Sequence, residues 1–209
     1  MKHRLFSAIP FAIAVCAASC LSASCLSAEV PLGKDGHPLN LGFETGDLRD
    51  WTATGTAFDG QPVKGDLPKA RRADMSSHHV GGYWIGGYEK AGDDPKGTLT
   101  SAPFKVTRPW ASFRFAAGAW PETRVELVDA ATGSVFLKMS GVENETLRPV
   151  AADLRDRVGK EIFIRLVDDR SGHWGHVNFD DFQLHAARPT FPDEYTLADA
   201  QKNIPPPAD

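Results

Sequence analysis

The stretch Glu161-Ile-Phe-Ile-Arg-Leu-Val-Asp168 decides the fold, because its apolar side chains stand at every second position. Ile162, Ile164 and Leu166 fall on one face of such a segment, and the intervening side chains fall on the other. This alternation predicts a half-buried β-strand. The pattern recurs in Trp110–Ala117, Thr123–Asp129 and Ser134–Met139, where we expect these side chains to face inward: Ala111, Phe113, Phe115, Val125, Leu127, Val135, Leu137 and Met139.

Turn signals separate these strands, and helical patterns are missing between them. Ala131-Thr132-Gly133, Val158-Gly159-Lys160 and Ser171-Gly172 are typical of turns. No run of ten or more residues carries an apolar stripe with a helical period, although Leu154–Val158 and Leu197–Lys202 fit single turns. Many short strands without helices favour an all-β fold, an antiparallel β-sandwich of the jelly-roll type.

The first 28 residues have the three parts of a secretory signal peptide. Lys2 and Arg4 give a basic start, an apolar run follows, and small residues lead to Ala28, where we expect cleavage. The apolar run is too short to span a bilayer as a helix, and no other stretch is long enough. We therefore predict a secreted or periplasmic protein. Lipidation at Cys25 is the less favoured alternative, because Leu21 lies one position too far upstream for a lipoprotein box.

Four segments follow from these patterns. Residues 1–28 are the signal peptide, 29–38 lead into the fold, 39–187 form the sandwich, and 188–209 read as a disordered Pro-rich tail. All three cysteines lie in the signal peptide, so an apolar core has to stabilise the rest of the chain without disulfides. Losing Lys2 and Arg4 changes the formal charge from −4 to −6, which argues against nucleic acid as a partner.

Ordered motifs across the sandwich segment resemble those of galactose-binding-like jelly-roll modules. They resemble in particular the fructan-binding modules attached to family 32 glycoside hydrolases such as levanases, and also exported planctomycete proteins of unknown role. The resemblance implies a carbohydrate-binding module. It departs at Ala116–Pro121, where the levanase-linked modules carry a glycine-rich stretch. The matching motifs are Phe43–Thr52, Gly97–Ser101 with Pro103-Phe104, Asp153-Leu154, Gly159-Lys160, Ile164–Asp168 and Gly172–Asp180.

The last predicted strand changes phase at Asp180-Asp181. Val177 and Phe179 share one face by alternation, whereas Phe182 and Leu184 occupy the opposite phase. A β-bulge absorbs the extra residue and re-aims a side chain there. The resemblance further implies a structural Ca²⁺ between an early Glu and a late Asp, which Glu44 and Asp180 match. We therefore expect Glu44, Asp180 and Asp181 as candidate calcium ligands. The alternative is that both aspartates are exposed or cap a turn.

A polar and aromatic cluster before the last strand is the predicted ligand site. Aromatic faces with carboxylate, guanidinium and imidazole groups suit sugar recognition. The long polar loop 59–80 is a second functional candidate, because long loops in compact domains often carry function. The alternative assigns Trp174 and His176 to packing at the end of the sandwich. The candidate ligand-binding residues are Arg124, Asp168, Trp174, His176, Trp120 and His173.

Three functions remain open, and binding without catalysis is the favoured one. The second is a structural or interaction module that docks an exported protein through its tail. The third is a glycoside hydrolase-associated or metal-dependent hydrolase built on His173 and His176. That spacing places the two side chains on opposite faces of a strand. The chain also carries no HExxH motif, no GxSxG elbow and no phosphate loop, so we do not predict an enzyme.

Overall fold

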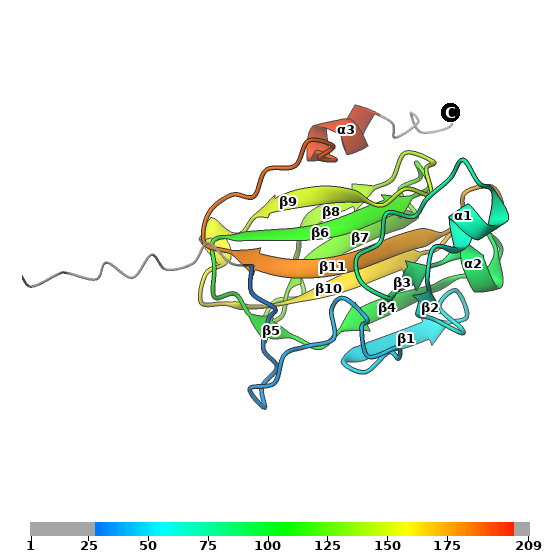
Figure 1. The fold of residues 1–209 in the computed structure, drawn as a ribbon. Helices are drawn as coiled ribbons and strands as arrows, with labels where there is room; N and C mark the ends of the chain where they lie inside the picture. The colour runs from blue at the N-terminus through cyan, green and yellow to red at the C-terminus, as the bar shows by residue number, and fades with distance from the viewer. Residues whose placement is uncertain (1–27, 203–209) are drawn as a thin grey trace, which may run out of the picture.

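The computed structural model describes residues 28–202, and two antiparallel sheets pack face to face in it (Figure 1). One sheet has the strand order β1-β4-β10-β7-β8, with β5 pairing on β10, and the other has the order β2-β3-β11-β6-β9. The all-β sandwich prediction is confirmed. The strands are β1 Trp51–Gly55, β2 Val63–Lys64, β3 Tyr83–Gly86, β4 Gly97–Ser101, β5 Phe104–Lys105, β6 Trp110–Ala117, β7 Thr123–Asp129, β8 Val135–Ser140, β9 Arg148–Asp153, β10 Glu161–Asp168 and β11 Val177–His185.

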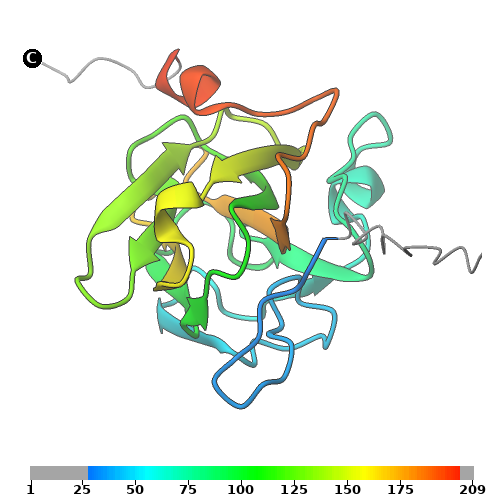
Figure 2. The ribbon, with the colours of Figure 1, turned by 90° about the vertical axis from the view of Figure 1, so that its left-hand side faces the viewer.

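Helices are short and lie outside the sheets. The structure contains α1 Leu67–Arg71, α2 Tyr88–Ala91, the 3₁₀ turn η1 Arg155–Arg157 and α3 Leu197–Lys202. The short α1 and α2 lie beside the start of β11 (Figure 1), and η1 lies at the other end of the sandwich, which faces the viewer in Figure 2. No described helix is long and apolar enough to cross a membrane.

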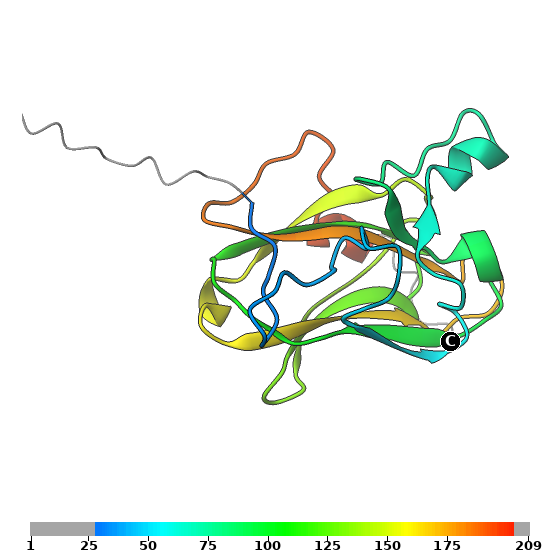
Figure 3. The same cartoon turned by 60° about the horizontal axis from the view of Figure 1, so that its bottom comes forward.

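The core fills the space between the two layers, which are seen separately in Figure 3. Side chains predicted to face inward on β6, β7 and β10 are buried there, as the alternation requires. Trp51 and Trp84 are also buried, but Trp84 belongs to a smaller cluster. Its indole donates to the carbonyl of Gly65, so the 59–80 loop covers it.

Val135 departs from the predicted pattern. It is 38% exposed, although its sequence phase matches that of buried Leu137. The β7–β8 pairing shifts register between Leu127 and Val128, so Phe136 has no direct partner opposite. This irregularity breaks the alternation at the end of the hairpin and turns Val135 outward.

The predicted bulge in β11 is present. Pairing with β6 is regular up to Asp180 and resumes at Gln183, with a register shift between them. Asp181 has a φ of 54°, in the left-handed region. The extra residue places Phe179 and Phe182 in the same core, and both are buried. The first matching motif, Phe43–Thr52, is mostly not a strand. Its residues 43–50 form turns, and β1 begins only at Trp51.

The C-terminal segment corrects the prediction of a disordered tail over 188–209. Tyr195 is 1% exposed, and its hydroxyl donates to the carbonyl of Ser140 at 2.6 Å. Its backbone N–H donates to the carbonyl of Pro149, so the segment ties the edge strands β8 and β9 together. A buried aromatic side chain and two edge-strand carbonyls thus order this proline-rich stretch as far as α3. Residues 203–209 lie outside the described residues.

The chain enters the fold just after the predicted cleavage point. Glu29 exchanges two backbone hydrogen bonds with Leu184, at 2.9 and 2.8 Å. The lead-in therefore adds a bridge to the end of β11. The predicted signal peptide, with all three cysteines, lies almost wholly outside the described residues.

Candidate functional site

The candidate site lies where β11 begins, at the end of the sandwich that carries α1 and α2 (Figure 1). Connections far apart in sequence meet there, because antiparallel strands bring their joining loops to the same ends of the sheets. They are the β2–β3 loop with α1, the β3–β4 connection with α2, the β8–β9 loop and the β10–β11 loop.

His176 is the buried centre of the site and is only 2% exposed. Its Nδ1 lies 2.7 Å from Asp93 Oδ1, and its Nε2 lies 3.6 Å from Glu145 Oε2. Asn178 Nδ2 donates to the same Glu145 oxygen at 3.1 Å. Buried charges require such partners, and here three different loops or strands supply them.

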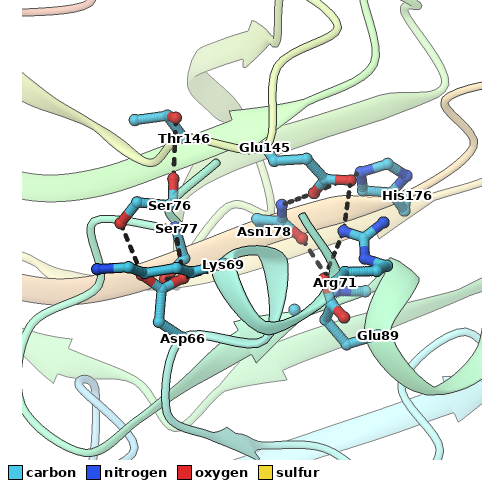
Figure 4. A network of polar contacts seen from close by, with 12 residues as sticks. Asp66, Lys69, Arg71, Ser76, Ser77, Glu89, Glu145, Thr146, His176 and Asn178 are labelled. Carbon is cyan, nitrogen blue, oxygen red and sulfur yellow. Dashed lines mark hydrogen bonds and ion pairs between the residues drawn. The ribbon is translucent and has the colours of Figure 1, made fainter. Parts of the chain in front are cut away.

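Arg71 extends this network to the surface from the C-terminal end of α1 (Figure 4). Its Nη2 lies 2.9 Å from Glu89 Oε1 and 3.2 Å from Glu145 Oε1. The guanidinium also lies 4.6 Å from the centre of the Tyr88 ring. One arginine therefore connects α1 to α2 and to the β8–β9 loop.

Asp66 fixes the loop that presents Arg71. As the cap of α1, its carboxylate accepts from the backbone N–H of Lys69 and Ser77 and from the Ser76 hydroxyl (Figure 4). Thr146 then donates to the Ser76 carbonyl at 2.9 Å. These bonds close the turn after α1 and join it to the β8–β9 loop.

The electrostatics of the site favour a protonated His176. Burial alone lowers the pKa of an imidazole, but the carboxylates of Asp93 and Glu145 outweigh it and raise the pKa of His176 to about 9. Burial likewise opposes ionisation of Glu145, yet His176 and Arg71 hold the pKa of that carboxyl below its usual value. Burial raises the pKa of Glu89.

Trp174 covers His176 and forms one wall of a groove. The two ring centroids are 5.2 Å apart, and Trp174 has a φ of 57°. This conformation is unfavourable for a bulky residue and costs on the order of 1–3 kcal/mol. The neighbouring Glu143, on the same groove, has a φ of 56°. Strained backbone at two groove residues is typical of binding sites.

Gly175 allows this arrangement. A Cβ atom there would lie 2.5 Å from the carbonyl oxygen of Asp93 and 2.6 Å from that of Arg170. Only glycine permits this close approach, which brings the Asp93 loop against the β10–β11 loop. The carboxylate of Asp93 reaches His176 as a result.

Two adjoining hollows form what we call the Trp174 groove, of about 580 and 210 Å³. They share Arg71, Glu145 and Trp174. The larger is within the size range of small-molecule sites, roughly 300–1,000 Å³. The groove is lined mainly by polar side chains with two aromatic rings, Tyr88 and Trp174.

Half of the predicted ligand-binding residues lie together here. Trp174, His173 and His176 line the smaller hollow. Asp168 lies behind them at the end of β10 and is 3% exposed. Burial raises its pKa to about 7, opposed in part by the positive charge of His176. It is therefore a neighbour of the network rather than a group at the groove surface.

Arg124 and Trp120 do not join this group. Arg124 donates to Glu126 and to the carbonyl of Pro121, and it lines a different hollow beneath α3. Alternation on β7 explains this, because Val125 faces the core and its neighbour must face outward. Trp120 packs under the guanidinium of Arg170, which lies 3.5 Å from its ring centre.

Several groove residues escaped the sequence prediction because they come from distant loops. Tyr88, Asp93 and Glu145 stand in no recognisable motif. Arg71 lies in the 59–80 loop, which its length and polarity marked as a functional candidate without identifying the residue. Pairing across such separations depends on the strand order, which alternation alone does not specify.

The three predicted calcium ligands surround the β11 bulge. Glu44 accepts hydrogen bonds from the backbone N–H groups of Gly82 and Tyr83. Asp180 Oδ2 accepts from the N–H of Val80 at 2.7 Å, while its buried Oδ1 has no hydrogen-bond partner among the described residues. Asp181 faces a separate groove with Glu44 and accepts from Gln183.

This carboxylate pair fits a cation only if backbone carbonyls complete its shell. Burial, with Asp181 and Glu44 nearby, raises the pKa of Asp180 to about 8. A buried carboxyl in that position requires a proton or a cation. Among residues 28–202, no three His, Cys, Asp or Glu side chains group closely enough to hold a metal by themselves.

The fold and the groove define an all-β sandwich module with an end-loop site, and known proteins resemble it. No protein-family model matches the chain. The putative glycosyl hydrolase ecdE of Aspergillus rugulosus is 27% identical over 150 residues, which cover 71% of this chain and 20% of that protein. The chain thus spans about a fifth of the length of the curated relative it matches.

Solved structures with a similar fold include binding and adhesin domains. TmCBM61 in complex with β-1,4-galactotriose has a TM-score of 0.41 and 19% identity, covering 69% of this chain and 93% of that one. The K1 cleaved adhesin domain of Lys-gingipain from Porphyromonas gingivalis W83 has a TM-score of 0.42 and 15% identity, covering 70% and 96%.

Proposed function

We propose that this chain is a non-catalytic module that binds carbohydrate in the Trp174 groove. The observation that carries the proposal is the position of Trp174, which is held in a strained conformation next to a fixed array of carboxylate, guanidinium and imidazole groups. Indole faces pack on the C–H groups of sugar rings, while such polar groups bond their hydroxyls. A site fixed before binding loses little entropy when it takes a ligand.

The two most suggestive acids support binding over turnover. Glu89 and Glu145 have pKa values shifted in opposite directions, as an acid and base pair would. Both, however, are ion-paired to Arg71, and their side chains are only 6% and 9% exposed. Carboxylates held in this way position Arg71 and His176 and are not free to attack a substrate.

The curated relative supports an accessory role. It is named a putative glycosyl hydrolase, and this chain matches only about a fifth of it. A non-catalytic module beside a catalytic domain accounts for both facts. On this proposal the module holds a glycan for an enzyme and performs no reaction itself.

A binding screen with two tryptophan variants tests the proposal. We expect the protein to retain a polysaccharide in affinity electrophoresis and Trp174→Ala to weaken binding by about tenfold or more. Trp110→Ala is the matched control, because Trp110 lies at the opposite end of β6, under Arg155 and Arg188. Equal loss in both variants, or no retention across neutral and charged polysaccharides, would refute the proposal.

We also propose that Ca²⁺ binds at the β11 bulge. Asp180 Oδ1 and Glu44 would hold the ion, with backbone carbonyls as further ligands. The unpaired buried oxygen of Asp180 supports this proposal. The bound ion would neutralise two neighbouring carboxylates and tie the start of the sandwich to its last strand.

Export to the cell exterior or periplasm is the third part of the proposal. Basic, apolar and small-residue segments in residues 1–28 support it. The pairing of Glu29 with Leu184 supports a mature chain that starts at that residue. Sequencing the N-terminus of the exported protein tests this, since a start at Glu29 agrees with it and a lipid-modified Cys25 favours the lipoprotein alternative.

A further inference from the structure

The positive charges of the Trp174 groove are already neutralised by the protein. Arg71 contacts both Glu89 and Glu145, at 2.9 and 3.2 Å. Arg72 lies 2.8 Å from Asp74. The third cation, His176, is buried between carboxylates on both sides of its ring. Each of these three cations therefore already contacts at least one carboxylate of the protein.

The negative charges of the groove exceed the positive ones. Asp74, Asp93, Glu143 and Glu145 line it, against the three cations. Glu143 is exposed, and no cation among the side chains described for residues 28–200 pairs with its carboxylate. A fifth carboxylate, Glu89, lies directly behind Arg71. The local potential is therefore negative, with one unpaired carboxylate at the rim.

We infer that the Trp174 groove selects uncharged glycans and rejects uronates, an inference that rests on the proposed function. A ligand carboxylate that approached Arg71 would meet the charges of Glu89 and Glu145, which already contact its Nη2, and would also face the unpaired Glu143. Repulsion between like charges near a protein surface is expected to weaken the binding of a uronate by roughly tenfold or more relative to its neutral counterpart.

Sugar hydroxyls are the groups that this groove can hold. An ionised carboxylate only accepts hydrogen bonds, and a hydroxyl donates one. Glu143 at the rim and Asp93 beside His176 lie on either side of Trp174 in the two hollows. A neutral sugar ring over the indole thus meets acceptors on both sides without adding a charge.

Matched polysaccharides that differ only in charge test the inference on the full chain. We would compare native polygalacturonate and alginate with the same polymers after carboxyl reduction, by affinity electrophoresis and calorimetry. The reduced polymers are expected to bind about tenfold or more tightly than the native ones. Added salt is expected to narrow that ratio, because it screens the repulsion while leaving neutral binding unchanged.

A variant that removes one charge distinguishes selection by charge repulsion from selection by the shape of the groove. Glu143→Gln is expected to narrow the affinity ratio between reduced and native polymers several-fold, because it removes the charge of the carboxylate and keeps a carbonyl acceptor. Glu161→Gln, at the far end of β10, is the control and should leave that ratio unchanged. Equal or tighter binding of native uronates by the wild-type protein would overturn the inference while sustaining carbohydrate binding. Failure of every neutral and charged polymer, across a wider panel, would remove the proposed function and this inference together.

Discussion

The imidazole of His176 lies 2.7 Å from the carboxylate of Asp93, although the two residues are 83 positions apart in the chain. The contact joins the β3–β4 connection to the loop before β11. Together with Glu145 on the other side of the ring, it raises the pKa of His176. A buried imidazole between two carboxylates is therefore part of the folded structure.

His176 predicts a pH-dependent stability. Its folded pKa of about 9 exceeds the ordinary value of about 6.5. Its contribution is then complete below about pH 6.5 and is lost as pH rises through about 9, at no more than about 1.4 kcal/mol per pH unit. Urea titrations from pH 6 to 10 should show this decline. His176→Gln should be less stable at pH 6 and should flatten the decline above pH 7.

The same pH series distinguishes other groups. Burial raises the pKa of Asp168 to about 7 and that of Asp180 to about 8, so both also cost stability as pH rises. The stability loss caused by Asp168 falls mostly at pH values below those at which His176 loses its proton. The loss caused by Asp180 overlaps the pH range of His176. A His176→Gln profile parallel to the wild type would contradict the assignment to this imidazole.

Glu145 is predicted to be the most costly groove carboxylate to neutralise. Glu145→Gln removes a charge that contacts both Arg71 and His176, and breaking a buried pair in this way costs about 3 kcal/mol or more. Urea denaturation measures this loss. Glu161→Gln is the control, because its ion pair with Lys34 is 3.9 Å long and exposed, so its loss should stay below about 1 kcal/mol. Similar losses in the two variants would show that the network does not stabilise the fold.

Calcium is predicted to raise the melting temperature through Asp180. Calcium at about 100 times its dissociation constant stabilises by about 2.7 kcal/mol, which corresponds to several degrees for a chain of this size. Asp180→Asn should lose this response in a thermal-shift assay with calcium and with chelator. Asp156→Asn, on the 3₁₀ turn η1, should keep it. A full response in Asp180→Asn would place the ion elsewhere, and no response in the wild type would exclude it.

Tyr195 is predicted to hold the C-terminal segment on the sandwich. Tyr195→Phe leaves the Ser140 carbonyl without its hydrogen bond and should cost about 1–2 kcal/mol. Tyr195→Ala also opens a cavity and should cost about 3–5 kcal/mol. Tyr88→Phe, at a residue that is 36% exposed, should be nearly neutral. Chemical denaturation checks the order, and a neutral Tyr195→Ala would show that the segment is dispensable.

The strands were predictable from the sequence because each depends on local alternation. Trp110–Ala117, Thr123–Asp129 and Glu161–Asp168 have the predicted bounds, and the phase change at Asp180-Asp181 predicted the bulge. Val135 was misplaced because the register shift opposite it depends on its partner strand. Tyr195 was missed because a proline-rich stretch with one aromatic residue gives no periodic signal.

Only the residues of the candidate site that lie in one loop could be predicted from the sequence. Trp174 and His176 were found because they stand together in one loop beside a predicted strand. Arg71, Asp93 and Glu145 reach them from three other connections, and their pairing follows from the order of strands in the sheets. Arg124 was predicted to bind the ligand from its side-chain chemistry, but it lines a different hollow. The residue type alone does not determine the face of the strand from which a side chain projects.

The bulge in β11 makes the reading frame of that strand part of the architecture. Asp181 is the residue that lets Phe179 and Phe182 occupy the same interior. Deleting it would make the alternation regular and keep Phe182 and Leu184 inside, because Phe182 would then follow Asp180 directly. Deleting Gln183 would instead turn Leu184 outward and His185 inward, so the effect of losing one residue from the last strand depends on whether that residue is the bulge itself.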